Sequence, residues 1–410
     1  MNERWAAIDQ GARTAKRAAF AETKRGAKRL RERVRNLGTT GANLTGRAWR
    51  RFAWTVNRLR KQGHELGEAR KRFATYRAEW AIERQLARLA AGSGPIVVGP
   101  WLSEVGYEVL YWVPFVRWVQ AQYSIHPSRF VVVTRGGAAV WYGDMGQRAV
   151  ELFDLMTPAE FAARNAQRSA EDRGTLKQFD ISAMDREILA QVHERLGLQE
   201  SEWLHPSLLY RLFHQFWLGH RPPSFLERRT RYRRLTVPVM DLPPLPASYV
   251  AVKFYGAQSL PPTEPVRRMV QSIVRRLAER TDVVLLDTGL AFDDHEDFVV
   301  GAANRVHVVR DALEPRTNLA VQTAIIAGAT AYVGTCGALA WLAPMLGVNT
   351  TAIFTDARFL HGHLGVARRV YQEMDGAGTF SPLDVSALDA LGLVDGLAGP
   401  VNVGHGRMSS

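Results

Sequence analysis

From residue 96 onward, short apolar runs alternate with amphipathic stretches along the chain. The apolar runs predict buried strands at Ile96–Gly99, Phe130–Thr134, Tyr249–Phe254, Val283–Asp287, Val306–Val309, Ala331–Gly334 and Thr350–Phe354. The stretches between them predict helices, among them Gly106 to about Ala121, Pro265–Glu279, Asn318–Ala327 and Ala338–Leu346. Strands that alternate with helices favour a parallel sheet covered on both faces, so the sequence predicts an α/β fold.

A proline-rich stretch, Val237–Pro246, divides this pattern into two units. The first unit continues into a mostly helical region over residues 146–235, and the second unit repeats the alternation of strand and helix. A break at Ala91–Pro95 separates both units from the N-terminal residues. We therefore expect two Rossmann-like parallel-sheet domains that face a cleft, preceded by a basic helical segment, with bounds at residues 1–92, 93–240 and 241–410.

The net charge of +13 is concentrated in the N-terminal segment. Residues 1–92 contain 23 Lys and Arg against 8 Asp and Glu, whereas the rest of the chain contains 30 and 32. A helical pattern runs from Arg47 to about Ala91, and its apolar residues recur every seven positions at Phe52, Leu59, Leu66, Phe73 and Trp80. A second heptad column begins apolar and then turns polar, so the pattern fits a sustained coiled coil only in part.

Several roles remain open for this basic amphipathic segment. An apolar stripe flanked by arginines suits self-association or a partner chain, an anionic membrane surface, or the body of the protein itself. Nucleic acid is the least expected partner, because no recognisable nucleic-acid-binding module accompanies the basic run. The chain has no signal-peptide pattern and no apolar stretch of membrane-spanning length. We therefore expect a cytoplasmic protein, peripheral on the inner face of the membrane if the segment binds lipid.

Polar residues follow several predicted strands of the second unit. Lys253 ends one strand, Arg310 follows another, and Gly334-Thr335-Cys336-Gly337 lies between a strand and a helix. The carboxyl ends of parallel strands share one edge of the sheet, so these groups converge. Two cations and the free N–H groups of a helix N-terminus suit a diphosphate. Each cation alone would equally fit an ordinary surface charge, and the glycines alone an ordinary tight turn.

Two amides stand near the same turn. Asn318 and Gln322 are four residues apart, so they share one face of the predicted helix. Asn318 would equally serve as the N-cap of that helix.

The first unit supplies a candidate general base. Glu104 and Glu108 lie where the first strand leads into a helix, and Gly106 between them allows another group to come close. Glu104 is the better candidate because it lies in the loop, where a cleft that removes water raises the pKa of a carboxylate toward neutrality. Glu108 is expected in the first helical turn, where an acid is favourable in any case.

Arg135 ends the second predicted strand, and Trp141 and Tyr142 follow closely. Aromatic faces bind sugar rings well, so these three residues and Glu108 are candidates for an acceptor subsite. Trp141 and Tyr142 would equally suit an ordinary core.

Signals for a metal or a cofactor are weak. The single cysteine, Cys336, excludes an internal disulfide framework and a multi-cysteine metal site. The chain has no Asp-x-Asp triplet, no Gly-x-x-x-x-Gly-Lys and no Gly-x-Gly-x-x-Gly after the first strand of either unit. We therefore expect no metal site and no resident cofactor.

Two segments resemble the GT-B-type glycosyltransferases, in particular bacterial members that use nucleotide sugars. "NLAVQTAIIAGATAYVGTCGALAWLAPMLGVNTTAIF" (Asn318–Phe354) resembles the donor-side region of that superfamily, where the diphosphate of the nucleotide sugar lies. "GPWLSEVGYEVLYWVPF" (Gly99–Phe115) resembles the first strand and glycine-containing loop of the acceptor-side domain. The resemblance covers roughly residues 94–375.

The resemblance implies an enzyme that moves a sugar from a nucleotide-sugar donor to a hydroxyl of a glycan or lipid-linked acceptor. Stabilisation of the departing diphosphate, in place of a metal, would fall to Lys253, Arg310 and the Thr335-Cys336-Gly337 turn. Asn318, Gln322 and Gly334 are further candidates for binding the donor. Glu104 would deprotonate the acceptor. The chain lacks the C-terminal Glu-rich motif common in retaining members, which favours inversion.

Other functions remain open beside this one. A nucleotide-sugar epimerase or hydrolase would use the same two-domain fold, with acids on both sides of the sugar. A non-catalytic glycan- or nucleotide-binding protein would use the basic helix for recruitment. An assembly protein with an inactive body would lose its oligomers when residues 1–92 are removed.

Overall fold

The computed structural model describes residues 75–171, 174–289, 296–301 and 303–386. Most of the predictions for the basic segment fall on residues 1–74 and lie outside this range. Residues 75–91 are helical, as expected. Ile82, Leu86 and Leu89 are buried in a hydrophobic core, whereas Trp80 of the heptad column is 58% exposed. The end of the predicted helix therefore packs on the body through a face other than the heptad stripe.

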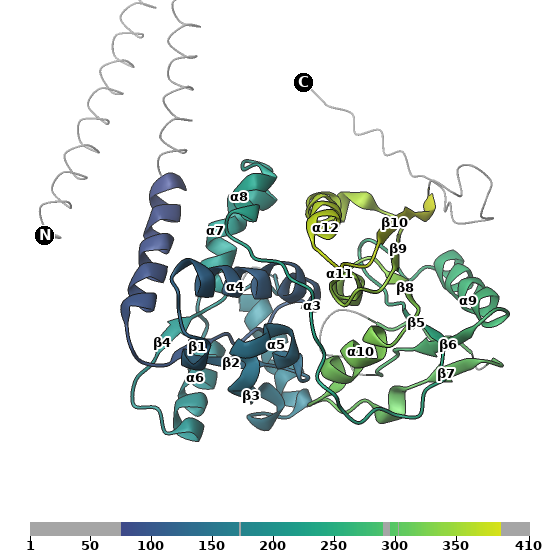
Figure 1. Cartoon of the computed structure of the whole chain (residues 1–410), viewed down its shortest axis with the longest axis horizontal. Coiled ribbons are helices and arrows are strands. Elements are labelled where there is room, and N and C mark those ends of the chain that lie inside the picture. Colours follow the sequence, from purple (N-terminus) through teal and green to yellow (C-terminus); the bar gives the residue numbers. More distant parts are fainter. Residues whose placement is uncertain (1–74, 172–173, 290–295, 302, 387–410) are drawn as a thin grey trace, which may run out of the picture. The chain divides into compact units, whose positions relative to one another are not determined.

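The first half of the body, residues 93–240, contains a four-stranded sheet (Figure 1). Its strand order is β3-β2-β1-β4, and every pair is parallel. The strands are β1 (Ile96–Val98), β2 (Phe130–Thr134), β3 (Ala149–Glu151) and β4 (Glu202–Leu204). The helices are α3 (Val105–Tyr107), α4 (Val113–Gln122), α5 (Pro158–Glu171), α6 (Ala183–Leu196), α7 (Ser207–Trp217) and α8 (Pro223–Glu227). A π-helical turn, Glu108–Trp112, joins α3 to α4, and a 3₁₀ segment, Ala138–Gln147, follows β2.

The second half, residues 241–386, contains a six-stranded sheet with the order β10-β9-β8-β5-β6-β7, again parallel throughout (Figure 1). Its strands are β5 (Tyr249–Lys253), β6 (Asp282–Leu285), β7 (Val306–Val308), β8 (Ala331–Thr335), β9 (Thr350–Phe354) and β10 (Phe380–Asp384). Its helices are α9 (Glu264–Ala278), α10 (Asn318–Ala327), α11 (Ala338–Met345) and α12 (His361–Glu373).

The central strands are mostly apolar, as suits sheets that are covered on both faces. Successive side chains of a strand point to opposite faces, and the cores follow this alternation. Val250 and Val252 of β5 pack with α9 in one core, whereas Ala251 belongs to a second core. That second core also contains Val98 of β1 and many residues of both halves, so the two sheets share a hydrophobic interior.

The predicted α/β fold with two parallel sheets is confirmed, and the linker separates their strands along the chain. Three strands were not predicted. β3 and β4 have three residues each and carry exposed side chains, so they leave no apolar run to detect. β10 contains Pro382, which an edge strand tolerates and which disguises it in the sequence.

Candidate active site

A cavity of about 580 Å³ lies at the carboxyl ends of strands from both sheets. Its lining includes residues that follow β1, β2, β5, β6 and β8, namely Glu104, Arg135, Tyr255, Thr288 and Gly337, together with Lys253 at the end of β5. Ligands of open α/β sheets bind in this position, and the volume is typical of a small-molecule site.

The turn from β8 into α11 forms one wall of this cavity. Cys336, Gly337 and Ala338 line it. The first two amides of α11 have no acceptor within the helix, whereas the amide of Ala340 donates to the carbonyl of Gly337 at 2.7 Å. Gly337 has φ 154°, and an added Cβ would come within 2.5 Å of the Tyr255 hydroxyl. Ala338 has a left-handed φ of 25°, a strained conformation for a residue with a side chain. The turn that lines the cavity therefore has a backbone conformation that residues with a side chain rarely adopt.

Gly334 and Thr335 shape this turn without lining the cavity. A Cβ on Gly334 would meet the carbonyl oxygen of Lys253 at 2.2 Å, so glycine lets β8 approach β5. The Thr335 hydroxyl accepts a hydrogen bond from the amide of Tyr255 and donates one to its carbonyl, both at 2.9 Å. Burial raises the pKa of the Cys336 thiol well above its usual range, so this lining residue is held as the neutral thiol.

Lys253 lines the cavity with a carboxylate already beside it. Its ammonium group lies 2.7 Å from Asp297, and both side chains are mostly buried. The backbone N–H and the hydroxyl of Thr288 also donate to Asp297, at 3.0 and 3.2 Å. The cation that is expected to bind a diphosphate is thus held in place by a carboxylate that partly neutralises its positive charge.

Arg310 does not line the cavity. Its guanidinium is 46% exposed and forms an ion pair with Asp287, which follows β6. Burial acts to raise the pKa of Asp287, but hydrogen bonds, above all the one from Arg310, hold it below its usual range. The two cations predicted to converge are therefore separated, and only Lys253 faces the cavity.

Asn318 and Gln322 both line the cavity and share one helix face, as expected. Gln322 donates to the side-chain oxygen of Asn318 at 3.2 Å, and its own oxygen is buried without a hydrogen-bond partner among the described residues. Thr317, and not Asn318, is the N-cap of α10. The carbonyl of Gly136 accepts the amides of Leu319 and Ala320 at 2.8 and 3.0 Å, so the first half caps this helix.

Glu104 enters the cavity from the loop after β1. It is the N-cap residue of α3, and its carbonyl accepts hydrogen bonds from the Trp101 indole at 3.1 Å and from the amide of Tyr107 at 3.2 Å. These contacts fix the backbone of the loop at the cavity that Glu104 lines.

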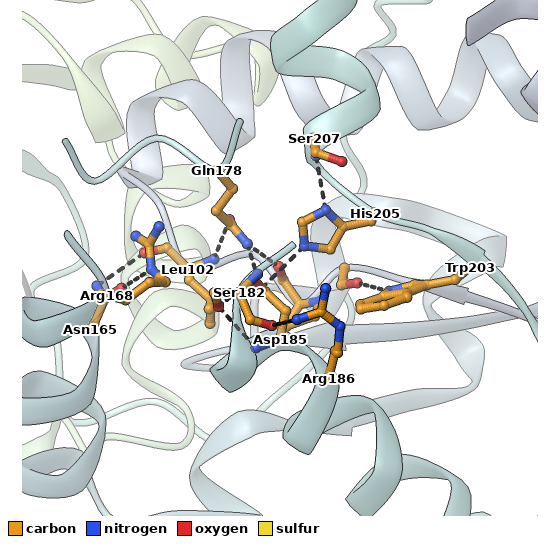
Figure 2. Close-up of polar contacts among 12 residues, drawn as sticks. Leu102, Asn165, Arg168, Gln178, Ser182, Asp185, Arg186, Trp203, His205 and Ser207 are labelled. Carbon is orange, nitrogen blue, oxygen red and sulfur yellow. Dashed lines mark hydrogen bonds and ion pairs between the residues drawn. The ribbon is translucent and has the colours of Figure 1, made fainter. Parts of the chain in front are cut away.

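A network of buried polar side chains also forms hydrogen bonds with the backbone of this loop (Figure 2). The Gln178 side chain donates to the carbonyl of Pro100 at 3.0 Å and accepts the amide of Leu102 at 2.9 Å. Gln178 also donates to Asp185, which lies 3.2 Å from His205. All three of these polar side chains are at most 2% exposed. Because breaking buried hydrogen bonds is expensive, the network fixes the loop that leads to Glu104.

A second arm of the network reaches the loop from α5. The Asn165 amide donates to the carbonyl of Leu102 at 3.1 Å, and the Arg168 guanidinium donates to the oxygen of Asn165 at 2.9 Å (Figure 2). On the other side, the Trp203 indole donates to the carbonyl of Gly99 at 2.7 Å.

Arg135 lines the cavity although its side chain is almost fully buried. One terminal nitrogen donates to the carbonyl of Ser103 at 2.8 Å, and the guanidinium carbon lies 5.2 Å from the ring centroid of Phe161. Its other terminal nitrogen is buried without a hydrogen-bond partner in the described part of the chain. This arrangement offers a fixed positive charge to the cavity.

Glu108, Trp141 and Tyr142 lie in the core and do not line the cavity. The Tyr142 hydroxyl donates to Glu108 at 2.9 Å, and burial raises the pKa of Glu108 to about 7. The Trp141 indole donates to the Thr323 hydroxyl of α10 at 2.9 Å, so it joins the two halves. Their burial corrects the expectation that these three side chains form a surface for an acceptor.

The structure brings other side chains to the cavity. Tyr107, Tyr111, Lys177 and His363 line the cavity beside Glu104. The sequence motif around Glu104 contains both tyrosines, but His363 comes from α12, and no local pattern joins it to them. No group of three or more His, Cys, Asp or Glu that could hold a metal ion occurs within the described ranges. Nor is any described helix both long and apolar enough to cross a membrane.

No protein-family model matches the chain, and no curated protein matches it. Among solved structures, the chain is similar to the E. coli heptosyltransferase WaaC with ADP, at 14% identity over 72% of this chain and 98% of that one, with a TM-score of 0.34. It is also similar to the iron-containing dodecameric glycosyltransferase TibC from enterotoxigenic E. coli H10407, at 12% identity and a TM-score of 0.33. That match covers 63% of this chain and spans 58% of the length of TibC.

An epimerase is among the similar structures as well. UDP-GlcNAc 2-epimerase from Methanocaldococcus jannaschii matches at 8% identity over 72% of this chain and 98% of that one, with a TM-score of 0.27. The similar structures thus include glycosyltransferases, the class that the two sequence segments resemble. At such identities and scores the likeness assigns no residue a role, so we derive the function from the cavity.

Proposed function

We propose that the cavity binds a nucleotide sugar and that the protein transfers its sugar to a hydroxyl group of a glycan or lipid-linked acceptor. One observation carries this proposal. Glu104 of the first half lines the same cavity as Lys253 and the N-terminus of α11 in the second half. A carboxylate base and an anion-binding wall in one cavity are the two elements that inverting sugar transfer from a diphosphate uses.

In the proposed reaction, Glu104 accepts the proton of the acceptor hydroxyl. The acceptor oxygen forms a bond to the anomeric carbon, and the bond from that carbon to the phosphate oxygen breaks. The electron pair of the broken bond leaves with the diphosphate. Because the acceptor oxygen attacks from the face opposite the diphosphate, the configuration at the anomeric carbon is inverted. Lys253, Arg135 and the first amides of α11 compensate the negative charge of the leaving group, which gives this scheme no need for a metal ion.

A nucleotide-sugar epimerase or hydrolase is the second candidate, because acids of both halves line the cavity. Glu104 comes from the first half, and Glu296 and Asp297 come from the second. An enzyme of this kind consumes the donor without an acceptor, whereas a transferase releases nucleoside diphosphate only when an acceptor is present.

The test incubates the full chain with ADP-, UDP-, GDP-, CDP- and dTDP-sugars, with and without a mixture of oligosaccharides and glycolipids. It measures both the nucleoside diphosphate released and any epimerised nucleotide sugar. We expect release that depends on the acceptor mixture. Glu104→Gln should lower turnover by about 10²–10⁴-fold while the Kd for the nucleoside diphosphate stays the same. Turnover of the donor alone would favour the epimerase or hydrolase, and equal losses of binding and turnover in Glu104→Gln would remove its role as the base.

A further inference from the structure

Three rings from distant parts of the chain meet on one wall of the cavity. The Tyr111 hydroxyl lies 2.5 Å from Nδ1 of His363, and the Tyr107 hydroxyl lies 3.1 Å from Nε2 of the same ring. Tyr111 belongs to the π-helical turn, Tyr107 ends α3, and His363 belongs to α12. All three residues line the cavity. Both nitrogens of one imidazole are therefore occupied by tyrosine hydroxyls of the opposite half.

The imidazole of His363 is neutral around pH 7. Burial, together with the nearby charge of Lys177, lowers its pKa to about 4. A neutral imidazole has one N–H donor and one nitrogen that accepts. It can therefore donate to only one of the two hydroxyls, and the other hydroxyl must donate to it.

The two distances indicate which hydroxyl does which. An O–H donor makes the shorter hydrogen bonds, whereas 3.1 Å is an ordinary N–H···O separation. We therefore infer that Tyr111 donates to Nδ1 and that Nε2–H donates to Tyr107. In this arrangement the Tyr107 hydroxyl accepts from His363, so its own proton is not used in that bond.

The ring of Tyr107 is held tightly at the wall of the cavity that it lines. The Trp217 and His363 rings meet it edge-on at centroid distances of 5.6 and 5.0 Å, and the Lys177 ammonium lies 4.9 Å from its centroid. Burial and the charge of Glu104 raise the pKa of the Tyr107 phenol, which keeps it protonated. Among the described residues, His363 is the hydrogen-bond partner of this hydroxyl.

We propose that the Tyr107 hydroxyl donates a hydrogen bond to an oxygen of the sugar in the cavity, and that His363 and Tyr111 position it for that contact. This inference rests on the proposed function, because it takes the ligand to be a nucleotide sugar. Tyr107 then determines specificity: a buried donor left without its acceptor is costly, so the site discriminates against a sugar that lacks this oxygen. His363 and Tyr111 are positioning residues that do not touch the ligand's reacting atoms.

The binding test uses the nucleoside diphosphate that binds the full chain most tightly and its commercial hexose conjugate. Tyr107→Phe removes the hydroxyl and keeps the ring. We expect it to weaken binding of the conjugate about tenfold and to leave the Kd of the nucleoside diphosphate unchanged. Tyr249→Phe is the matched control, because its hydroxyl donates to the carbonyl of Ile325 and Tyr249 does not line the cavity.

A double-mutant cycle separates positioning from a merely structural role. His363→Leu should weaken the conjugate through Tyr107, so adding it to Tyr107→Phe should produce little further loss. Additive losses of affinity would contradict the proposal that His363 acts through Tyr107. If the nucleoside diphosphate binds but Tyr107→Phe behaves like Tyr249→Phe, the sugar contact is wrong while the proposed function stands. If no nucleoside diphosphate binds the folded chain, the proposed function fails and the sugar contact fails with it.

The hydrogen bonds from Tyr111 to His363 and from His363 to Tyr107 can be tested without a ligand. Long-range ¹H–¹⁵N spectra of the full chain labelled on histidine distinguish the two neutral tautomers, and the signals of His363 are those lost in His363→Leu. We expect a neutral ring protonated on Nε2 at pH 7. A ring protonated on Nδ1, or a charged ring, would overturn the assignment of the Tyr107 proton.

Discussion

Gly106 lies so close to the first residue of α11 that a Cβ on it would stand 2.9 Å from the backbone nitrogen of Ala338. The same Cβ would lie 3.3 Å from the ring of Trp341. Gly106 is two residues after Glu104, so this contact sets how near the candidate base comes to the helix N-terminus that faces the cavity. The absence of a side chain at position 106 is thus part of the geometry of the site.

Gly106→Ala should therefore disturb both stability and ligand binding. Overpacking of a close contact costs about 1–3 kcal/mol of unfolding free energy, and displacement of α11 should weaken nucleoside-diphosphate binding. Denaturant unfolding and calorimetry measure the two effects. Gly94→Ala is the matched control, because an added Cβ there meets nothing within 4 Å. Equal behaviour of the two variants would show that the contact is not tight in solution.

The ion pair of Lys253 and Asp297 makes an asymmetric prediction. Lys253→Met removes a cation from the cavity and should raise the Kd for a nucleoside diphosphate about tenfold. Asp297→Asn leaves the cation and removes a competing negative charge, so its Kd should be equal or lower. Titration calorimetry on both variants checks this. A loss in Asp297→Asn as large as that in Lys253→Met would mean that the pair is structural and that Lys253 does not bind the phosphate.

Glu108 predicts a pH dependence of stability. Its pKa in the fold is about 7, above the ordinary value near 4.5, because burial disfavours the charged carboxylate. The folded state therefore holds the proton more tightly, and the resulting stability is present below pH 4.5 and lost as the pH rises through 7. Between pH 5 and 8, the unfolding free energy of the neutral variant Glu108→Gln should rise relative to that of the wild type by up to about 3 kcal/mol.

Denaturant unfolding of the wild type and of Glu108→Gln at pH 5, 6, 7 and 8 measures this difference. Because both proteins share every other titrating group, the difference between them isolates Glu108. A difference that does not change with pH would contradict a raised pKa.

The network behind the Glu104 loop predicts an effect on turnover from a residue outside the cavity. Gln178→Ala removes the hydrogen bonds to Pro100 and Leu102 and should lower the unfolding free energy by about 2–4 kcal/mol. Because it loosens the loop that carries Glu104, kcat should fall more than the affinity for a nucleoside diphosphate. Gln167→Ala, on the exposed face of α5, is the control. Unchanged kcat in folded Gln178→Ala would separate the network from the site.

Much of the fold followed from the sequence because apolar runs bounded by turns mark buried strands without knowledge of the partner strands. For the same reason, residues next to strand ends could be expected at one edge of a sheet, and Glu104, Arg135, Lys253 and Gly337 all line one cavity. Their roles in binding and catalysis stay predictions. Pairings between distant residues were not visible. Arg310 meets Asp287 and not the cavity, because that contact depends on how β7 lies beside β6.

The aromatic residues show the same limit. Trp141 and Tyr107 are both aromatic residues that follow a predicted strand, so the sequence does not distinguish their environments. Packing alone decides that Trp141 is buried in the core and that Tyr107 lines the cavity. The partner of Tyr107 lies 256 residues away in α12, so no local spacing encodes their contact. The polar network around Gln178 likewise joins a loop, a helix and the end of β4.

The most direct test of the central claim is titration calorimetry of the full chain with ADP, UDP, GDP, CDP and dTDP. The proposed function predicts that one of them binds, that Lys253→Met weakens this binding, and that Glu104→Gln does not. The same ligand should raise the melting temperature, because it binds only the folded state. If none of the five binds to the folded protein, the cavity is not a nucleotide-sugar site and the proposed transfer is wrong.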